Sequence, residues 1–170
     1  MDMLRLFGEQ TRQTAWADAL VLSAIIGRRE AEEDAQIIEK LRHQHLVQRA
    51  FLDFWRGLPI DPHLTKSLDI HALSVFAKAV HGETARFHES VKPEELDRIV
   101  DLPSKRLMAE RLGFEPGDPT LAQTFLQVFS HSAYHRGQIC VRLREIAIDP
   151  PMTDYIVWIW SHQPEPCWPC

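Results

Sequence analysis

The sequence predicts an all-α protein, a four-helix bundle with a long connection between the third and fourth helices and a short C-terminal helix. Four long segments repeat apolar residues at intervals of three and four, which is the period of one helix face, and no segment alternates convincingly as a strand does. Prolines and glycines gather between these segments. Because amphipathic helices bury their apolar faces against one another, four of them predict a bundle.

The first helix is expected from about Phe7 to Ile26. Its apolar side recurs every three or four residues, at Trp16, Ala19, Leu20, Ser23 and Ile26. Gly27 and the charged stretch 28–34 interrupt the pattern. The second helix is then expected over 35–56, with Gly57 as its stop and Pro59 just beyond.

The third helix is expected to begin at Ser67 or Asp69, either of which can act as an N-cap, and to reach about Ser90. Residues 91–117 hold three prolines and two glycines. This stretch predicts a long connection with local turns and one helical turn over 104–112. A connection of this length is typical of bundles with a crossover.

The fourth helix is expected to open at Asp118, as N-cap, with Pro119 at its first position, and to run to about Ile146. Its apolar stripe is Leu121, Phe125, Val128, Ile139, Leu143 and Ile146. Two prolines after Asp149 end it, and residues 153–160 predict a final short helix that packs back onto the bundle. The aromatic residues of the second and last helices are expected in the core or in a homodimer interface, namely Phe51, Phe54, Trp55, Trp158 and Trp160.

Length and composition favour one globular domain over residues 1–163, followed by an irregular, exposed tail over 164–170. Cys167 and Cys170 lie in this proline-broken tail, and we expect them to be dispensable for any metal. With 19 basic against 24 acidic residues, the chain has no cationic excess for nucleic acid. No apolar run reaches the ~18–20 residues that span a bilayer. We expect a cytoplasmic protein that acts on a small molecule and contacts neither nucleic acid nor membrane.

Two histidines interrupt the apolar stripe of the fourth helix. His131 and His135 are one helical turn apart, so both imidazoles can face a single ion. The alternative is that each is satisfied by a neighbouring carbonyl or carboxylate. A third ligand would come from another helix, where His43 and His45 are both candidates. Periodicity does not choose between them, because each lines up with apolar neighbours.

The motif His131-x-x-x-His135-Arg-Gly-Gln-Ile, the pair Trp16-Ala17 and the ending Pro150-Pro151-x-x-Asp154-Tyr155 make the chain similar to the DinB/YfiT-like superfamily over nearly its whole length. This resemblance implies a divalent metal held by a second-helix histidine together with the pair. Matching the family's pattern to Val47, Gln48, Leu52 and Gly57 implies His43 as that ligand, with His45 as the alternative. Where many members carry a glutamate, this chain has Gln48. The family name refers to induction by DNA damage and implies no contact with DNA.

Some members of that family resemble thiol-dependent transferases or isomerases. Three neutral imidazoles leave an ion electron-poor, with a position free for a thiol or a water. We therefore expect a metal-dependent enzyme that transfers a low-molecular-weight thiol to a small electrophile. The alternatives are a metal-dependent hydrolase and a non-catalytic metal-binding bundle. Zn or Ni is the expected metal, and Fe, Mn and Co accept the same ligands.

Four residues close to the histidine pair in the sequence also suggest roles in or around the site. Gln138 shares their face and is expected to orient a ligand or to join two helices. Arg136 is expected at the surface or in helix pairing, or on an anionic substrate group. Gly137 suggests close approach of another helix, and Tyr134 suggests packing. Surface or ordinary polar roles are expected for His63, His71, His81, His88 and His162.

Overall fold

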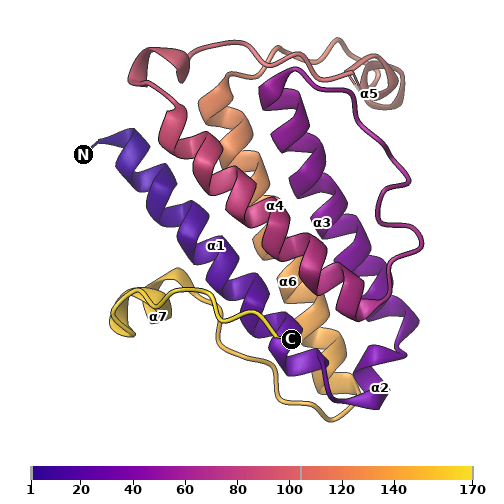
Figure 1. The fold of residues 1–170 in the computed structure, drawn as a ribbon. Coiled ribbons are helices and arrows are strands. Elements are labelled where there is room, and N and C mark those ends of the chain that lie inside the picture. Colours follow the sequence, from indigo (N-terminus) through magenta and orange to yellow (C-terminus); the bar gives the residue numbers. More distant parts are fainter. Residues whose placement is uncertain (1, 104, 170) are drawn as a thin grey trace.

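The computed structural model describes residues 2–103 and 105–169, and within them it is helical without any strand. In chain order the elements are α1 (Met3–Ile25), α2 (Arg29–Glu32), α3 (Ala35–Arg56), α4 (Ile70–Ser90), the 3-10 turn η1 (Pro93–Glu95), α5 (Lys105–Leu112), α6 (Leu121–Glu145) and α7 (Tyr155–Trp160). The four long helices α1, α4, α3 and α6 pack side by side as a bundle (Figure 1). The predicted all-α class is confirmed.

The bundle is closed by four helix pairs: α1 with α4, α4 with α3, α3 with α6, and α6 with α1. The long connection between α4 and α6 carries η1 and α5 and runs over one end of the bundle (Figure 1). The chain after α6 returns along α1 with α7 and the C-terminal tail. The helices that carry the candidate histidines, α3 and α6, are therefore neighbours, and a shallow groove lies between them.

Local chemistry explains most helix ends. Asp34 begins α3 by accepting hydrogen bonds from the backbone N–H groups of Gln36 and Ile37. Gly57 ends the same helix in the left-handed region at φ 68°, where a Cβ would be strained. Both bounds of α3 agree with the sequence prediction. Of the two predicted caps of α4, Asp69 is the N-cap.

The predicted start of α6 is wrong by two residues. Thr120, not Asp118, is the N-cap, and its side chain forms a capping box with Gln123. Asp118 instead accepts a hydrogen bond from Lys105 Nζ at 2.6 Å. The backbone here is held extended, because the Pro119 carbonyl accepts from Val100 N–H and Ile99 bridges to Thr120. This long-range pairing competes with the local cap signal and delays the helix.

Smaller differences occur at the chain ends and in the first connection. Helix α1 begins at Met3 rather than near Phe7, because Asp2 caps it. The predicted break over 28–34 contains the single-turn helix α2. Helix α7 starts at Tyr155, two residues after the predicted start, and Asp154 before it is extended.

The core lies between the four long helices. One apolar cluster, around Leu22, Leu41 and Leu143, fills the end near α2, and an aromatic cluster around Phe7, Trp55 and Phe125 fills the other. The indole N–H of Trp55 donates to Thr124 Oγ1 at 2.9 Å. Trp55 and Trp158 are therefore core residues of the chain itself, whereas Trp160 is 71% exposed.

The C-terminal tail has no regular secondary structure in its described residues, but part of it packs against the bundle. Trp168 packs against the apolar cluster near α2, and the Pro164 carbonyl accepts from the indole N–H of Trp158 at 3.1 Å. Cys167 is exposed. Cys170 lies outside the described residues.

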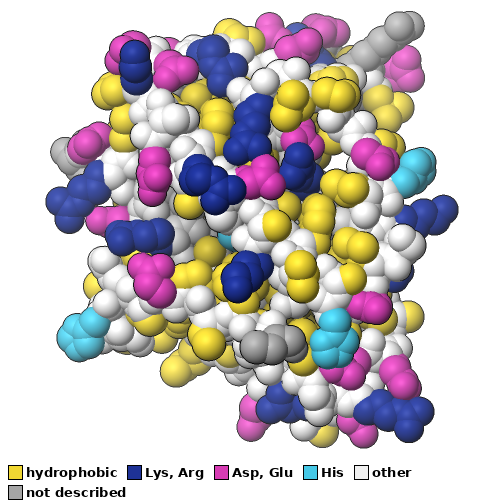
Figure 2. All heavy atoms as spheres, viewed as in Figure 1, with side chains coloured by type: hydrophobic (Ala, Val, Ile, Leu, Met, Phe, Trp, Pro, Cys, Tyr) yellow, Lys and Arg dark blue, Asp and Glu magenta, His cyan; other side chains and the backbone are white. Residues whose placement is uncertain are grey.

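Among the described helices, none combines the length and the hydropathy that crossing a bilayer requires. On the face shown in Figure 2, basic and acidic side chains are interspersed over the long helices, so neighbouring charges of opposite sign offset each other.

Candidate metal centre

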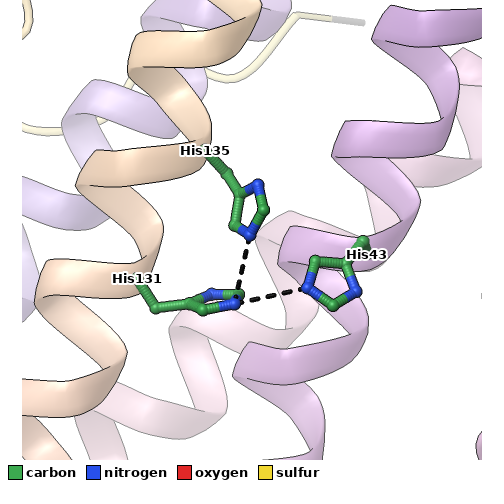
Figure 3. A group of neighbouring side chains, drawn as sticks. All are labelled: His43, His131 and His135. Atoms are coloured by element: carbon green, nitrogen blue, oxygen red, sulfur yellow. Dashed lines mark hydrogen bonds between the residues drawn. The ribbon is translucent and has the colours of Figure 1, made fainter.

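Three imidazoles converge between α3 and α6 (Figure 3), beside the shallow groove that these two helices line. His131 and His135, one turn apart on α6, place their Nε2 atoms 3.1 Å from each other. His43 on α3 places its Nε2 atom 3.3 Å from that of His131. Nitrogens bound to one tetrahedral ion at 2.0–2.1 Å are about 3.3 Å apart. The spacing therefore fits a shared ion.

The donor chemistry also fits a cation. Two neutral imidazole nitrogens can form a hydrogen bond only if one of them carries the proton and the other accepts it. Where three such nitrogens converge, their hydrogen bonds cannot all be satisfied at once, and lone pairs are left facing each other. The Nδ1 atom of His131 is buried and has no hydrogen-bond partner in the described part of the chain, so no hydrogen bond stabilises the other side of this ring. A single ion would accept the lone pairs of all three Nε2 atoms.

The structure separates the two candidates on α3. His43 is the residue that meets the pair on α6, and it is exposed, so the site opens to solvent. His45 is fully buried, and its Nδ1 donates to Gln48 Oε1 at 2.8 Å. Two residues along a helix correspond to a rotation of about 200°, which is why only one of them reaches the groove.

Gln138 orients His135. Its side-chain oxygen accepts from His135 Nδ1 at 2.9 Å, which leaves the lone pair on Nε2, the atom that faces the other two histidines. This is one of the two roles predicted for Gln138. Burial lowers the pKa of His135, with a further contribution from the nearby His43, against the opposing effect of the Gln138 hydrogen bond.

The site favours neutral imidazoles. Burial lowers the pKa of His131 to about 4, and the neighbouring His135 and His43 act in the same direction. Burial makes a protonated, positively charged ring unfavourable at His131 and His135. Their nitrogens therefore keep their lone pairs at neutral pH and are available as metal ligands.

Two of the other neighbours differ from the sequence expectations, and the third agrees in part. Tyr134 is 63% exposed, so it does not pack in the core, but its ring packs edge-to-face on that of His135 with the centroids 5.2 Å apart. Among the described residues, no neighbouring helix approaches Gly137, because a Cβ there would meet no atom from outside its own helix within 4 Å. Gly137 instead lines a groove of about 590 Å³ between α1 and α6. Arg136 is buried and pairs α6 with α1 through Asp18, so its surface alternative is wrong.

A second polar cluster lies inside the bundle around Asp18, whose side chain is fully buried. Its Oδ1 accepts from Gln44 and Arg136, and its Oδ2 accepts from Gln48 and His81, all at 2.7–2.9 Å. Burial alone would raise the pKa of Asp18, but the Arg136 charge and the His81 hydrogen bond hold it well below its usual range. With four donors and a neutralising guanidinium, this carboxylate is satisfied by protein groups, and we interpret the cluster as a buried ion-pair network.

Sequence reasoning missed this network. His81, assigned a surface or ordinary polar role, is a buried partner of Asp18. His88 is buried as well, and its ring packs on Phe125. One signal in the sequence could have indicated this network. Asp18 and Gln44 lie within the predicted helices as polar residues among apolar ones, and buried polar side chains are usually paired with each other.

Stability of the metal-free protein is expected to fall on acidification from pH 7 to pH 5. Unfolded imidazoles take up protons near pH 6.5, whereas folded His131 does so near pH 4. Between these values the unfolded chain binds more protons, so the free energy of unfolding decreases as pH falls. After allowance for solvent screening, we expect a loss of about 1 kcal/mol, or roughly 2–4 °C in Tm.

Thermal unfolding of chelator-treated protein at the two pH values measures this. The His131→Gln variant removes the titrating group and should show a weaker dependence on pH. Equal Tm values for the parent protein at pH 7 and pH 5 would contradict the expectation.

Comparisons with known proteins agree with the fold and the cluster. The sequence profile of the DinB family matches residues 28–166, a range that contains α3 and α6 and all three converging histidines. A search among curated proteins gave no match. Because the profile covers most of the chain, including both helices that carry the histidines, this protein belongs to the DinB family.

Proposed function

We propose that the protein is a metal-dependent enzyme whose centre is formed by His43, His131 and His135. The observation that carries the proposal is the convergence of three Nε2 atoms between α3 and α6, with two of the separations 3.1 and 3.3 Å, at a place where His43 is exposed. Three protein ligands with solvent access are typical of catalytic metal sites, whereas structural sites close the fourth position with a protein ligand.

The ligand set suits a divalent transition metal, with Zn or Ni first and Fe, Mn or Co also compatible with imidazole. When bound, such an ion would lower the pKa of a coordinated thiol or water towards neutrality. The residues contribute orientation and charge: Gln138 fixes the ring of His135, and three neutral imidazoles leave the ion its full positive charge.

Transfer of a low-molecular-weight thiol is the reaction we favour over hydrolysis. Hydrolysis calls for a general base near the attacking water, and among the described residues no carboxylate joins the three histidines. In the transfer, sulfur would form a bond to an electrophilic carbon, the leaving group would depart with the bonding electron pair, and the thiol proton would pass to solvent.

A shallow pocket beside the histidines offers an anchor for the body of such a thiol. It has a volume of about 230 Å³ and begins one helical turn from the ligands, at Lys40 and Gln138. Among the described side chains no carboxylate pairs with the Lys40 ammonium. Lys40 is therefore available for a carboxylate of a small substrate, and it lies near enough to His135 for its charge to contribute to lowering the pKa of that histidine.

The test is metal analysis of protein purified without a polyhistidine tag, followed by Co(II) substitution and titration with thiols. We expect about one metal ion per chain, and a new near-ultraviolet charge-transfer band when 3-mercaptopropionate or cysteamine is added. If thiols leave the spectrum unchanged while azide or acetate alters it, the hydrolase is the better proposal. If neither changes it, the centre is closed and the enzymatic proposal fails.

Lys40→Ala provides a matched control within this experiment. The substitution should weaken binding of 3-mercaptopropionate, which carries a carboxylate, and leave binding of cysteamine, which carries none, unchanged. Equal affinities of the variant and the parent for both thiols would remove Lys40 as the anchor.

A further inference from the structure

We infer that Asp18 is a positioning residue that sets how the two histidine-bearing helices, α3 and α6, are oriented relative to each other. Asp18 itself lies on α1, which carries none of the three histidines. The inference rests on the proposed metal centre. The side chain of Asp18 is fully buried. Its Oδ1 accepts from Gln44 Nε2 on α3 at 2.8 Å and from Arg136 Nη1 on α6 at 2.9 Å. One oxygen atom thus joins both ligand helices.

The positions of these donors in the sequence give the network its meaning. Gln44 directly follows His43, and Arg136 directly follows His135. Successive residues of a helix are about 100° apart around its axis. In both helices the histidine turns towards the groove, and the residue after it turns its side chain towards the interior of the bundle. A hydrogen bond that holds this next residue also fixes the rotation of the helix about its axis, and with it the direction of the imidazole.

The third histidine is connected in the same way. Ser132 follows His131, and its Oγ accepts from Gln48 Nε2 at 3.0 Å. Gln48 Nε2 also donates to Asp18 Oδ2 at 2.7 Å. All three candidate ligands are thus followed by a residue whose side chain reaches Asp18, directly or through Gln48. These three residues, Gln44, Ser132 and Arg136, are fully or almost fully buried.

Burial makes this arrangement stiff. A buried polar group that loses its partner costs about 1–3 kcal/mol, so each donor is strongly held to its acceptor. His81 Nε2 on α4 donates the fourth hydrogen bond to Asp18, at 2.8 Å, and ties the fourth long helix to the same carboxylate. Functional sites need their side chains held within about 0.5 Å, and a shared buried acceptor can hold two helices to that tolerance.

The experiment is to replace Asp18 by Asn and to measure Co(II) affinity and the visible Co(II) spectrum. Asn has the same shape, but it loses the charge and presents N–H groups where Gln48 or His81 now donates. We expect the affinity to fall about 10- to 100-fold, the range seen for residues that orient metal ligands, with a shift of the d–d bands. A residue that only stabilises the fold would leave the spectrum of the folded protein unchanged.

Asp53→Asn is the matched control. Asp53 is a buried aspartate on α3, paired with Arg49 at 2.9 Å, and among the described residues its side chain forms no hydrogen bond to the network around Asp18. This variant should lower Tm while keeping the parent's Co(II) affinity and spectrum. If Asp18→Asn behaves like Asp53→Asn, with a lower Tm but parent-like Co(II) binding, the inference is overturned.

Gln44→Leu keeps the test decisive if Asp18→Asn does not fold. It removes one donor to Oδ1 and leaves the neutralising Arg136 in place, and the same loss of affinity and shift of the spectrum are expected. Parent-like Co(II) binding by folded Gln44→Leu would reject the positioning role. Failure of the parent protein to bind any metal would instead reject the proposed function, so the two failures are distinguishable.

Discussion

Protein in which both His131 and His135 are replaced by alanine is expected to contain less than about a tenth of the metal of the parent, with unchanged helical content. The double variant removes two of three nitrogens around one position, so affinity should fall by at least about a hundredfold. The helix itself should persist, because Phe125, Ile139 and Leu143 remain buried along it. Metal analysis and far-ultraviolet circular dichroism measure the two quantities.

Single variants on α3 sharpen this expectation. His43→Ala should lose most of the metal, whereas His45→Ala should keep it while losing stability, since the buried His45 contacts Gln48 instead of the groove. His63→Ala serves as a control at an exposed histidine. Full metal occupancy in the double variant, or retention in His43→Ala with loss in His45→Ala, would show that the ion binds elsewhere.

Phe125→Ala is expected to destabilise the whole bundle by about 3–5 kcal/mol, the usual cost of deleting a buried aromatic ring. Phe125 is 1% exposed and its ring packs against those of Phe7, Trp55 and Phe87. For a chain of this size the loss corresponds to roughly 10 °C or more in Tm. Differential scanning calorimetry of metal-free protein is the appropriate measurement.

Leu126→Ala is the control for this variant, because it is the next residue on the same helix and is more than half exposed. Its Tm should change little. At temperatures where Phe125→Ala remains folded, its Co(II) spectrum should match that of the parent, since among the described rings Phe125 packs on none of His43, His131 and His135. A Tm change of less than about 3 °C for Phe125→Ala would mean that the aromatic cluster does not support the bundle as described.

The helices could be predicted because their signals are local. An N-capping aspartate, a C-terminal glycine and an apolar period of three to four residues each act within one or two turns, and α3 accordingly begins and ends where its sequence indicates. The start of α6 could not be predicted, because pairing of Ile99 with Thr120 across the connection extends the chain beyond Asp118. A contact so distant in sequence leaves no local pattern.

The sequence by itself determined the all-α class and the pairing of His131 with His135 on one helix face, while the family resemblance implied His43 and left His45 as the alternative. Only the tertiary structure decided that His43 reaches the groove while His45 is buried, since the periodicity of α3 admits either residue on an apolar side. It also decided the partners of Asp18, which come from three other helices. A buried carboxylate selects its donors by where packing places them, and packing depends on the simultaneous fit of all four helices rather than on any one segment.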